Sequence, residues 1–279
     1  MRHFFRFTLI AAFILLIPVL LISRTATFQD RPAITYFPAT GSITFNQAET
    51  RLKQENNRVN WSVGSSVNRR VYLLQDFSIL YKNNRLIAII NHWERNRISL
   101  FKSRSVKIDP GFYESLSMHQ AEVHEDDLIY GKITRSADRI YAGQIGGKLY
   151  TFKQARSKRE IKLRQSYHNK INKEQSDLLA EAVKQYGIAR EKYHVFPLSE
   201  LFSKSSDEVF PSSGEGAQRI SGQLMEGIYT TMVRGIQTPD GRLQSPVGSL
   251  MPLLLIGPDH LLVVIQTSNY QIALLRQQF

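Results

Sequence analysis

The densest group of potential metal ligands in the sequence lies between residues 119 and 127. On a β-strand, Glu122, His124 and Asp126 would point to the same face, because side chains alternate between the two faces of a sheet. Imidazole and carboxylate groups on one face could hold a hard or borderline cation. A polar strand end that runs into an acidic turn would give the same pattern without a metal. The candidate metal ligands are His119, Glu122, His124 and Asp126.

Two shorter patterns match parts of catalytic or phosphate-binding motifs. Ser99 and Lys102 fit S-x-x-K, in which a lysine one helical turn away activates a serine nucleophile. The surrounding residues favour a strand, however, where these two side chains would face opposite ways. Gly214 and Gly216 precede a predicted helix, but they lack the lysine and the spacing of a P-loop. We therefore assign no catalytic residue and no cofactor from the sequence.

A basic tract is the one charged feature above background. Eight lysine and arginine residues fall between positions 153 and 173, opposed there only by Glu160. Such a tract could bind a phosphate-rich polymer or lipid headgroups, or it could be a solvated linker or helix face. The candidate polyanion-binding residues are Lys153, Arg156, Lys158, Arg159, Lys162, Arg164, Lys170 and Lys173.

The composition limits the classes of protein. The chain has 279 residues, 42% of them hydrophobic, which is ordinary globular composition. It contains no cysteine, which excludes disulfides, thiolate metal sites and thiol nucleophiles. The net charge of +12 would draw the protein toward polyanions.

The N-terminus carries a membrane-entry pattern. Arg2 and Arg6 precede an uncharged, mostly apolar run over residues 7–22. A helix of this length spans roughly 24 Å, slightly less than the ~30 Å hydrocarbon core, so an anchor and a signal peptide both fit. A cleavage site after Ala26 would place Arg24 at a position that favours small residues. We therefore predict an uncleaved anchor over residues 1–24 with the following domain outside, or a secreted protein if the segment is cleaved.

The first half of the remaining chain is typical of antiparallel strands. We expect a stalk over residues 25–45, a short polar helix over residues 46–57, and then a β-meander. Asn83 and Asn84 favour a tight turn between strands at residues 71–81 and 86–93. Gly146 and Gly147 predict a second two-residue turn. Further strands are expected over residues 115–123, 128–134, 139–144 and 148–152.

The second half mixes helices and strands. Asn172 and Gln175 have the spacing of a capping box, and Gly187 has the position of a C-cap, so we predict a helix between them. A loop over residues 203–216, a helix over 220–232, and strands over 251–256, 261–266 and 270–275 follow. The predicted class is α+β: an N-terminal membrane helix, an antiparallel β-meander, central helices and a C-terminal β-meander. A β-rich region (46–153) and an α+β region (154–279) could form one continuous domain.

These features lead to two functional hypotheses. The first is a membrane-anchored extracytoplasmic binding or regulatory protein of the bacterial cell envelope, which binds an envelope protein, an anionic wall polymer or lipid headgroups. The second is an exported hydrolase or transferase whose dispersed site uses several of His92, Glu94, His119, His124, Asp126 and Asp127. The membrane address disfavours a nucleic-acid partner. An enzyme would require acid, base and substrate cleft to converge.

Overall fold

The computed structural model describes residues 35–39 and 41–279, which belong to one compact unit, Ile34–Phe279. The predicted membrane segment, residues 7–22, lies outside the described residues. So does most of the predicted stalk. No helix in the described part of the chain is both long enough and apolar enough to cross a membrane.

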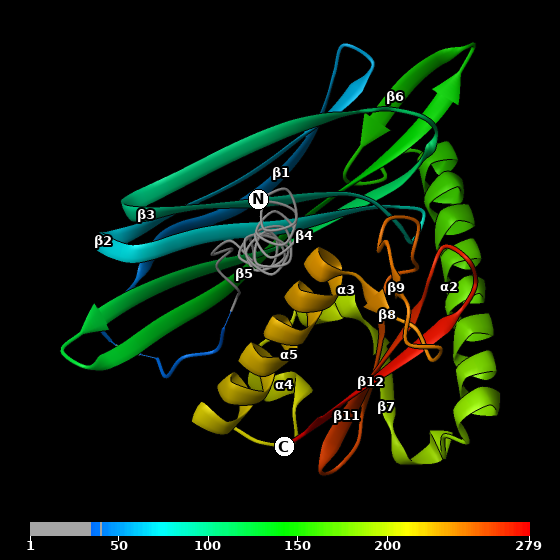
Figure 1. Ribbon diagram of the computed structural model, residues 1–279. Coiled ribbons are helices and arrows are strands. Elements are labelled where there is room, and N and C mark those ends of the chain that lie inside the picture. Colours follow the sequence, from blue (N-terminus) through cyan, green and yellow to red (C-terminus); the bar gives the residue numbers. More distant parts are fainter. Residues whose placement is uncertain (1–34, 40) are drawn as a thin grey trace, which may run out of the picture. The chain divides into compact units, whose positions relative to one another are not determined.

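The larger sheet contains six antiparallel strands (Figure 1): β1 (Phe45–Glu55), β2 (Arg58–Lys82), β3 (Arg85–Lys107), β4 (Gly111–Glu125), β5 (Leu128–Ile145) and β6 (Lys148–Phe152). β3 pairs along β2 on one edge, with a register shift between Ser66 and Val71. The other edge of β2 is shared, first by β1 and then by β4. β1 therefore comes close to β5, and the Leu52 amide donates to the Asp138 carboxylate at 2.6 Å.

The turn predictions are confirmed, but the polar helix is wrong. Asn83 and Asn84 adopt φ of 47° and 69°, and Gly146 and Gly147 adopt 53° and 81°. The stretch expected as a helix over residues 46–57 is strand β1 and its turn. Its polar composition reflects an edge strand with one exposed face, while Leu52 on the other face is buried in the core. Pairing with β2 overrides the local helical preference.

The smaller sheet has the order β12-β11-β10-β7. The expected C-terminal meander is confirmed as β10 (Leu253–Ile256), β11 (His260–Gln266) and β12 (Ile272–Gln278), and β7 (His194–Pro197) pairs with β10. A short hairpin lies between β8 (Ile236–Gln237) and β9 (Leu243–Gln244). The fold is thus α+β, with mostly antiparallel sheet and few helices.

Two long helices join the sheets. α2 (Lys158–Tyr186) contacts both sheets. The Tyr167 hydroxyl donates to the Ala142 carbonyl in the larger sheet, and the Tyr186 hydroxyl donates to the Ile272 carbonyl in the smaller sheet. α5 (Glu215–Arg234) packs Tyr229 against Phe77 of β2, with ring centroids 5.0 Å apart. Figure 1 shows α5 between the two sheets and α2 along their common side. Both sheets therefore belong to one folded unit.

The predicted helices are present, with one boundary corrected. α2 ends at Gly187 as expected, where φ is 64°, but it begins at Lys158 and not at Asn172. The true start is a capping box in which Ser157 and Glu160 bond each other's backbone amides. α5 covers the expected second helix, while the predicted loop before it contains α4 (Ser206–Val209). The short α3 (Leu198–Leu201) and η1 (Arg190–Lys192) complete the helices of the described region.

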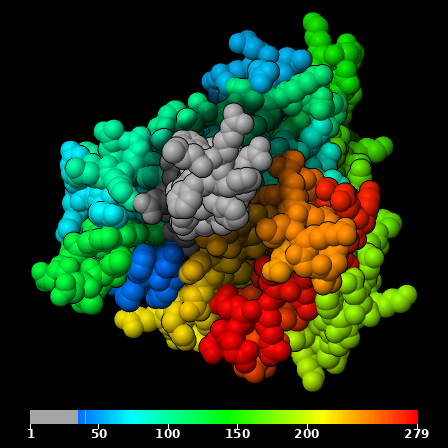
Figure 2. Space-filling view, in the orientation of Figure 1, coloured from blue at the N-terminus to red at the C-terminus, as the bar shows by residue number. Residues whose placement is uncertain are grey.

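Residues 35–39 lie against the folded unit. The Pro38 carbonyl accepts from the Gly131 amide at 3.1 Å, and the Tyr36 amide donates to Glu226 of α5 at 3.3 Å. In Figure 2 the blue N-terminal stretch is seen between the green of β5 and the yellow of α4 and α5. The described end of the predicted stalk is thus part of the domain surface.

Candidate functional site

The N-terminal half of α2 presents a basic face to solvent. Six of the eight predicted polyanion-binding residues lie on α2, and Lys153 and Arg156 precede it. At about 100° per residue, five of the six fall within an arc of roughly 120°, and only Arg164 lies outside it. All of these cationic residues are exposed. We call the arc the α2 basic face; its members are Lys158, Arg159, Lys162, Lys170 and Lys173.

The opposite side of the helix explains this orientation. Ile171 and Leu178 are buried against the sheets, and the Tyr167 hydroxyl donates to the Ala142 carbonyl at 2.8 Å. These contacts fix the rotation of α2 about its axis, because apolar residues at helical spacing must face the core. The α2 basic face is therefore held outward by the packing of its other side.

Few of these cations are neutralised inside the protein. Lys153 pairs with Asp138 and Lys173 pairs with Asp177, each at 2.6 Å. Glu160 accepts from the backbone amides of Arg156 and Ser157, which lowers its pKa and commits it to the helix cap. Within the described residues, no carboxylate lies at ion-pair distance from the three remaining lysines of the face. These are Lys158, Lys162 and Lys170.

The position of the charges is unfavourable for the helix itself. Lys158, Arg159 and Lys162 lie in the first two turns, where the helix dipole has its positive end. Each positive charge at this end of the helix lowers the stability of the helix by about 0.3–1 kcal/mol at low ionic strength. The capping box already satisfies the amides of Arg156, Ser157 and Glu160, so the exposed positive charge here comes from the side chains. The arrangement thus costs helix stability and leaves these side-chain charges exposed to solvent.

The four predicted metal ligands are not brought together. His119 is fully buried, whereas Glu122 and His124 point to the other side of β4 and bond each other at 2.5 Å. Asp126 lies in the following turn with φ of 53°. Among the described residues, no group of three or more histidine, aspartate or glutamate side chains could hold a metal ion.

His119 instead joins a buried relay that sequence reasoning missed. Its Nδ1 lies 2.7 Å from Asp76 Oδ1, and its Nε2 lies 2.7 Å from Ser136 Oγ. The three residues come from β2, β4 and β5, so only the strand register unites them. The sequence signal that could have pointed to a buried polar network is a set of serines at inward-facing strand positions: Ser65, Ser78, Ser115 and Ser117.

The relay continues through hydroxyl groups inside the sheet. Ser65 donates to Asp76 at 2.7 Å, and the Thr50 hydroxyl lies 2.6 Å from Ser136 and 2.5 Å from Ser117. The order of carboxylate, imidazole and hydroxyl is the one that activates a serine in hydrolases. Here the Ser136 hydroxyl is held from both sides, by His119 and by Thr50 of β1.

The other residues of the hydrolase hypothesis lie apart from this relay. His92 is 3.6 Å from Glu94, which also pairs with Arg97 in the middle of β3. Asp127 belongs to the turn between β4 and β5. Of the six predicted residues, His119 alone has both an acidic and a hydroxyl partner.

A second group of titratable side chains lies between β4, β5 and α2. Tyr141 Oη and His168 Nε2 are 2.8 Å apart, and burial lowers the pKa of His168. Burial also raises the pKa of Glu114 to about 7, against the opposing effect of Arg139 across the strand pair. These titratable groups thus lie where α2 packs on the larger sheet.

Within the described residues, the α2 basic face and the buried relay are thus two features with evident chemical capacity. Comparisons with protein-family models, with curated proteins and with solved structures find no match for the chain.

Proposed function

We propose that this chain is a membrane-anchored extracytoplasmic binding protein of the bacterial cell envelope, and that the α2 basic face holds its anionic partner. The observation that carries the proposal is the set of exposed lysines on one side of α2 without carboxylate partners in the described region. The apolar run over residues 7–22 supports the proposed membrane anchor and extracytoplasmic location.

The chemistry of the partner follows from the spacing of the charges. Lys158, Lys162 and Lys170 present separate ammonium groups along the helix, which suits a repeated phosphate better than a single small anion. An anionic wall polymer and a layer of anionic lipid headgroups both offer such phosphates. Each lysine near an anionic lipid surface contributes about 1 kcal/mol.

The test uses the full-length chain in nanodiscs of neutral lipid, titrated with a phosphate-rich wall polymer. A parallel arm uses nanodiscs that contain anionic lipid, with protection of lysines from amine labelling as the readout. The test variant carries Lys158→Gln, Lys162→Gln and Lys170→Gln. We expect at least about ten-fold weaker polymer binding, or loss of protection, together with a smaller dependence on salt.

A matched variant separates this face from net charge. Lys102, Lys107 and Lys192 are also exposed, and their replacement by glutamine changes the charge equally. This variant should retain binding. Equal losses in both variants, or binding that does not weaken with salt, would overturn the role of the α2 basic face. The arm that responds identifies the polymer or the lipid as the source of the phosphates.

The proposed location of the domain outside the membrane is tested independently by protease shaving of intact cells. An outward domain predicts cleavage of residues 35–279 from outside. Protection of these residues in intact cells, with cleavage after lysis, would place the domain inside and remove the proposed partners.

A second candidate function is hydrolysis, favoured by the Asp76–His119–Ser136 relay. In this mechanism His119 would accept the Ser136 proton as the serine attacks an ester or amide carbonyl, while Asp76 holds the imidazolium. A fluorophosphonate probe should then label Ser136, and His119→Gln should abolish the labelling. An unlabelled Ser136 in the folded chain rules this function out.

A further inference from the structure

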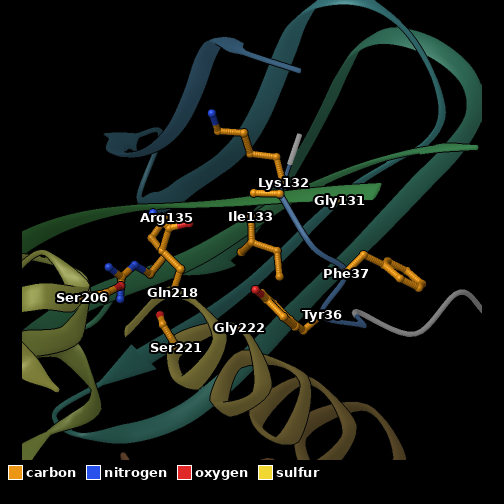
Figure 3. Close-up of a pocket in the computed structure, with 11 residues that line it drawn as sticks. Tyr36, Phe37, Gly131, Lys132, Ile133, Arg135, Ser206, Gln218, Ser221 and Gly222 are labelled. Carbon is orange, nitrogen blue, oxygen red and sulfur yellow. The ribbon is translucent and has the colours of Figure 1, made fainter. Parts of the chain in front are cut away.

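A cavity of about 260 Å³ lies within the folded unit beside residues 36–39, well separated in sequence from the α2 basic face (Figure 3). Three parts of the chain line it: residues 36–39, β5, and the α4–α5 region. In Figure 3 the labelled Arg135, Ser206, Gln218 and Ser221 gather toward one end, and Tyr36 and Phe37 lie toward the other. The cavity thus has a polar end and an aromatic end.

Arg135 carries an unsatisfied charge at the polar end. Its Nη2 donates to the Lys204 carbonyl at 3.2 Å, while its Nη1 is buried and has no hydrogen-bond partner in the described structure. No ion pair of Arg135 is present among the described residues. Arg135 is half-buried, and a guanidinium with a buried, unpaired N–H group and no counter-charge is unfavourable. A bound anion would remove that cost.

The lining matches an anion of single charge. None of the eleven lining residues is acidic, and Ser206, Ser221 and Gln218 can donate hydrogen bonds beside Arg135. Lys132 also lines the cavity, but Figure 3 shows its ammonium directed away from the other labelled side chains. One carboxylate would therefore balance the single charge of the half-buried Arg135, whereas a phosphate dianion would leave excess negative charge.

The adjacent strand edge indicates the shape of the ligand. The Gly131 amide points away from β4, because it donates to Pro38 at 3.1 Å. In a β-strand, the N–H and C=O groups of every second residue point to the same side. The amides and carbonyls of Ile133 and Arg135 therefore lie on the same edge of β5 as those of Gly131. In the described part of the chain, no backbone–backbone bond outside the strand ladders uses these groups. An extended segment can add there, as residues 35–39 begin to do.

We propose that this cavity binds an extended peptide through a carboxylate, which pairs with Arg135 while the peptide backbone lies along the edge of β5. The apolar end, with Tyr36, Phe37 and Ile133, would take a neighbouring side chain. The partner is thus an acidic peptide segment of another protein, bound at a site distinct from the α2 basic face.

The test uses the full-length chain in detergent micelles with the Ile133 methyl group labelled for NMR. The probes are a short blocked peptide of alternating valine and threonine with one central glutamate, the same peptide with glutamine, free acetate, and inorganic phosphate. We expect the glutamate peptide to shift the Ile133 signal and to bind at least about ten-fold more tightly than the glutamine peptide. Acetate should bind weakly, because it lacks a backbone.

Arg135→Gln should abolish this preference for glutamate. Arg219→Gln, an equal change of charge at an exposed position of α5, should preserve it. Unfolding by urea gives a second readout. Removal of the unpaired, half-buried charge of Arg135 should leave stability unchanged or increase it, whereas substitution of a structural arginine would lower stability.

Several results would overturn the proposal. They are equal binding of the two peptides, tighter binding of phosphate than of the glutamate peptide, and no change at Ile133 with any probe at millimolar concentration. A preference for glutamate that survives Arg135→Gln would also overturn it, as would marked destabilisation by that substitution. Because none of these readouts involves α2, failure here leaves the polyanion proposal intact.

Discussion

His119 and Asp76 lie directly opposite each other on β4 and β2, with Nδ1 and Oδ1 2.7 Å apart and both side chains fully buried. Ser65 donates a hydrogen bond to the same carboxylate oxygen, while Asp76 Oδ2 has no hydrogen-bond partner among the residues that the structure describes. The pair therefore places a polar core between the two apolar clusters of the larger sheet.

Removal of one partner from this pair should be strongly destabilising. For Asp76→Ala we expect a loss of about 3–5 kcal/mol in the free energy of unfolding, because His119 would stay buried without its counterpart. Urea unfolding followed by circular dichroism measures the change. Asp109→Ala removes an exposed partner of Lys82 and should cost at most about 1 kcal/mol. A small effect at Asp76 would mean that water or other side chains replace the pair.

The docking of residues 35–39 depends on one glycine of α5. A Cβ at Gly222 would lie 2.2 Å from the Tyr36 ring, which is closer than atoms can approach. We expect Gly222→Ala to displace Tyr36 and to speed proteolysis within residues 35–39. Limited proteolysis with mass spectrometry would detect the new cleavage.

Gly227 on the same helix supplies the control for this substitution. A Cβ there meets nothing within 4 Å, so Gly227→Ala should stabilise the helix by roughly 0.5–1 kcal/mol without a change in cleavage. Identical protease patterns for both variants would show that the Tyr36 contact does not hold this stretch.

Local rules predict the turns and helix ends but not the contacts between distant strands. Asn83, Asn84 and Gly187 are identified correctly because left-handed backbone positions favour these residue types. The start of α2 is missed, although the Ser157–Glu160 capping box is visible in the sequence, because Asn172 and Gln175 imitate one.

The candidate sites show the same limit. The basic tract is local, so the sequence reveals its residues, and only its orientation requires the structure. The residues of the relay come together only through the register of three strands. The alternation of residues along a strand shows which hydroxyls face inward, but not which of them lies next to His119. Arg135 is an ordinary surface arginine in the sequence, and only the structure places it in one cavity with residues as distant as Tyr36 and Ser221.

The capping box supports the α2 basic face, so its loss should affect binding indirectly. Ser157→Ala removes the side-chain acceptor for the Glu160 amide and should cost about 0.5–2 kcal/mol of stability. The first turn would fray, and polymer binding should weaken less than in the triple lysine variant. Ser166→Ala changes an exposed serine within the same helix and should have little effect. Hydrogen exchange at residues 158–162 distinguishes fraying from global destabilisation.

Glu114 should make stability fall as pH rises. Burial raises its pKa from 4.5 to about 7, so the folded state holds the proton more tightly than the unfolded state. Its contribution is fully present below about pH 4.5 and is lost as pH passes through about 7. The expected loss is on the order of 1 to 3 kcal/mol, given about 1.4 kcal/mol per pKa unit. Glu114→Gln should flatten this part of the profile, measured by urea unfolding from pH 5 to 8. Because Arg139 lies opposite, an unchanged profile in the variant would mean that the charge of Arg139 offsets the burial of Glu114 and that other groups set the pH dependence of stability.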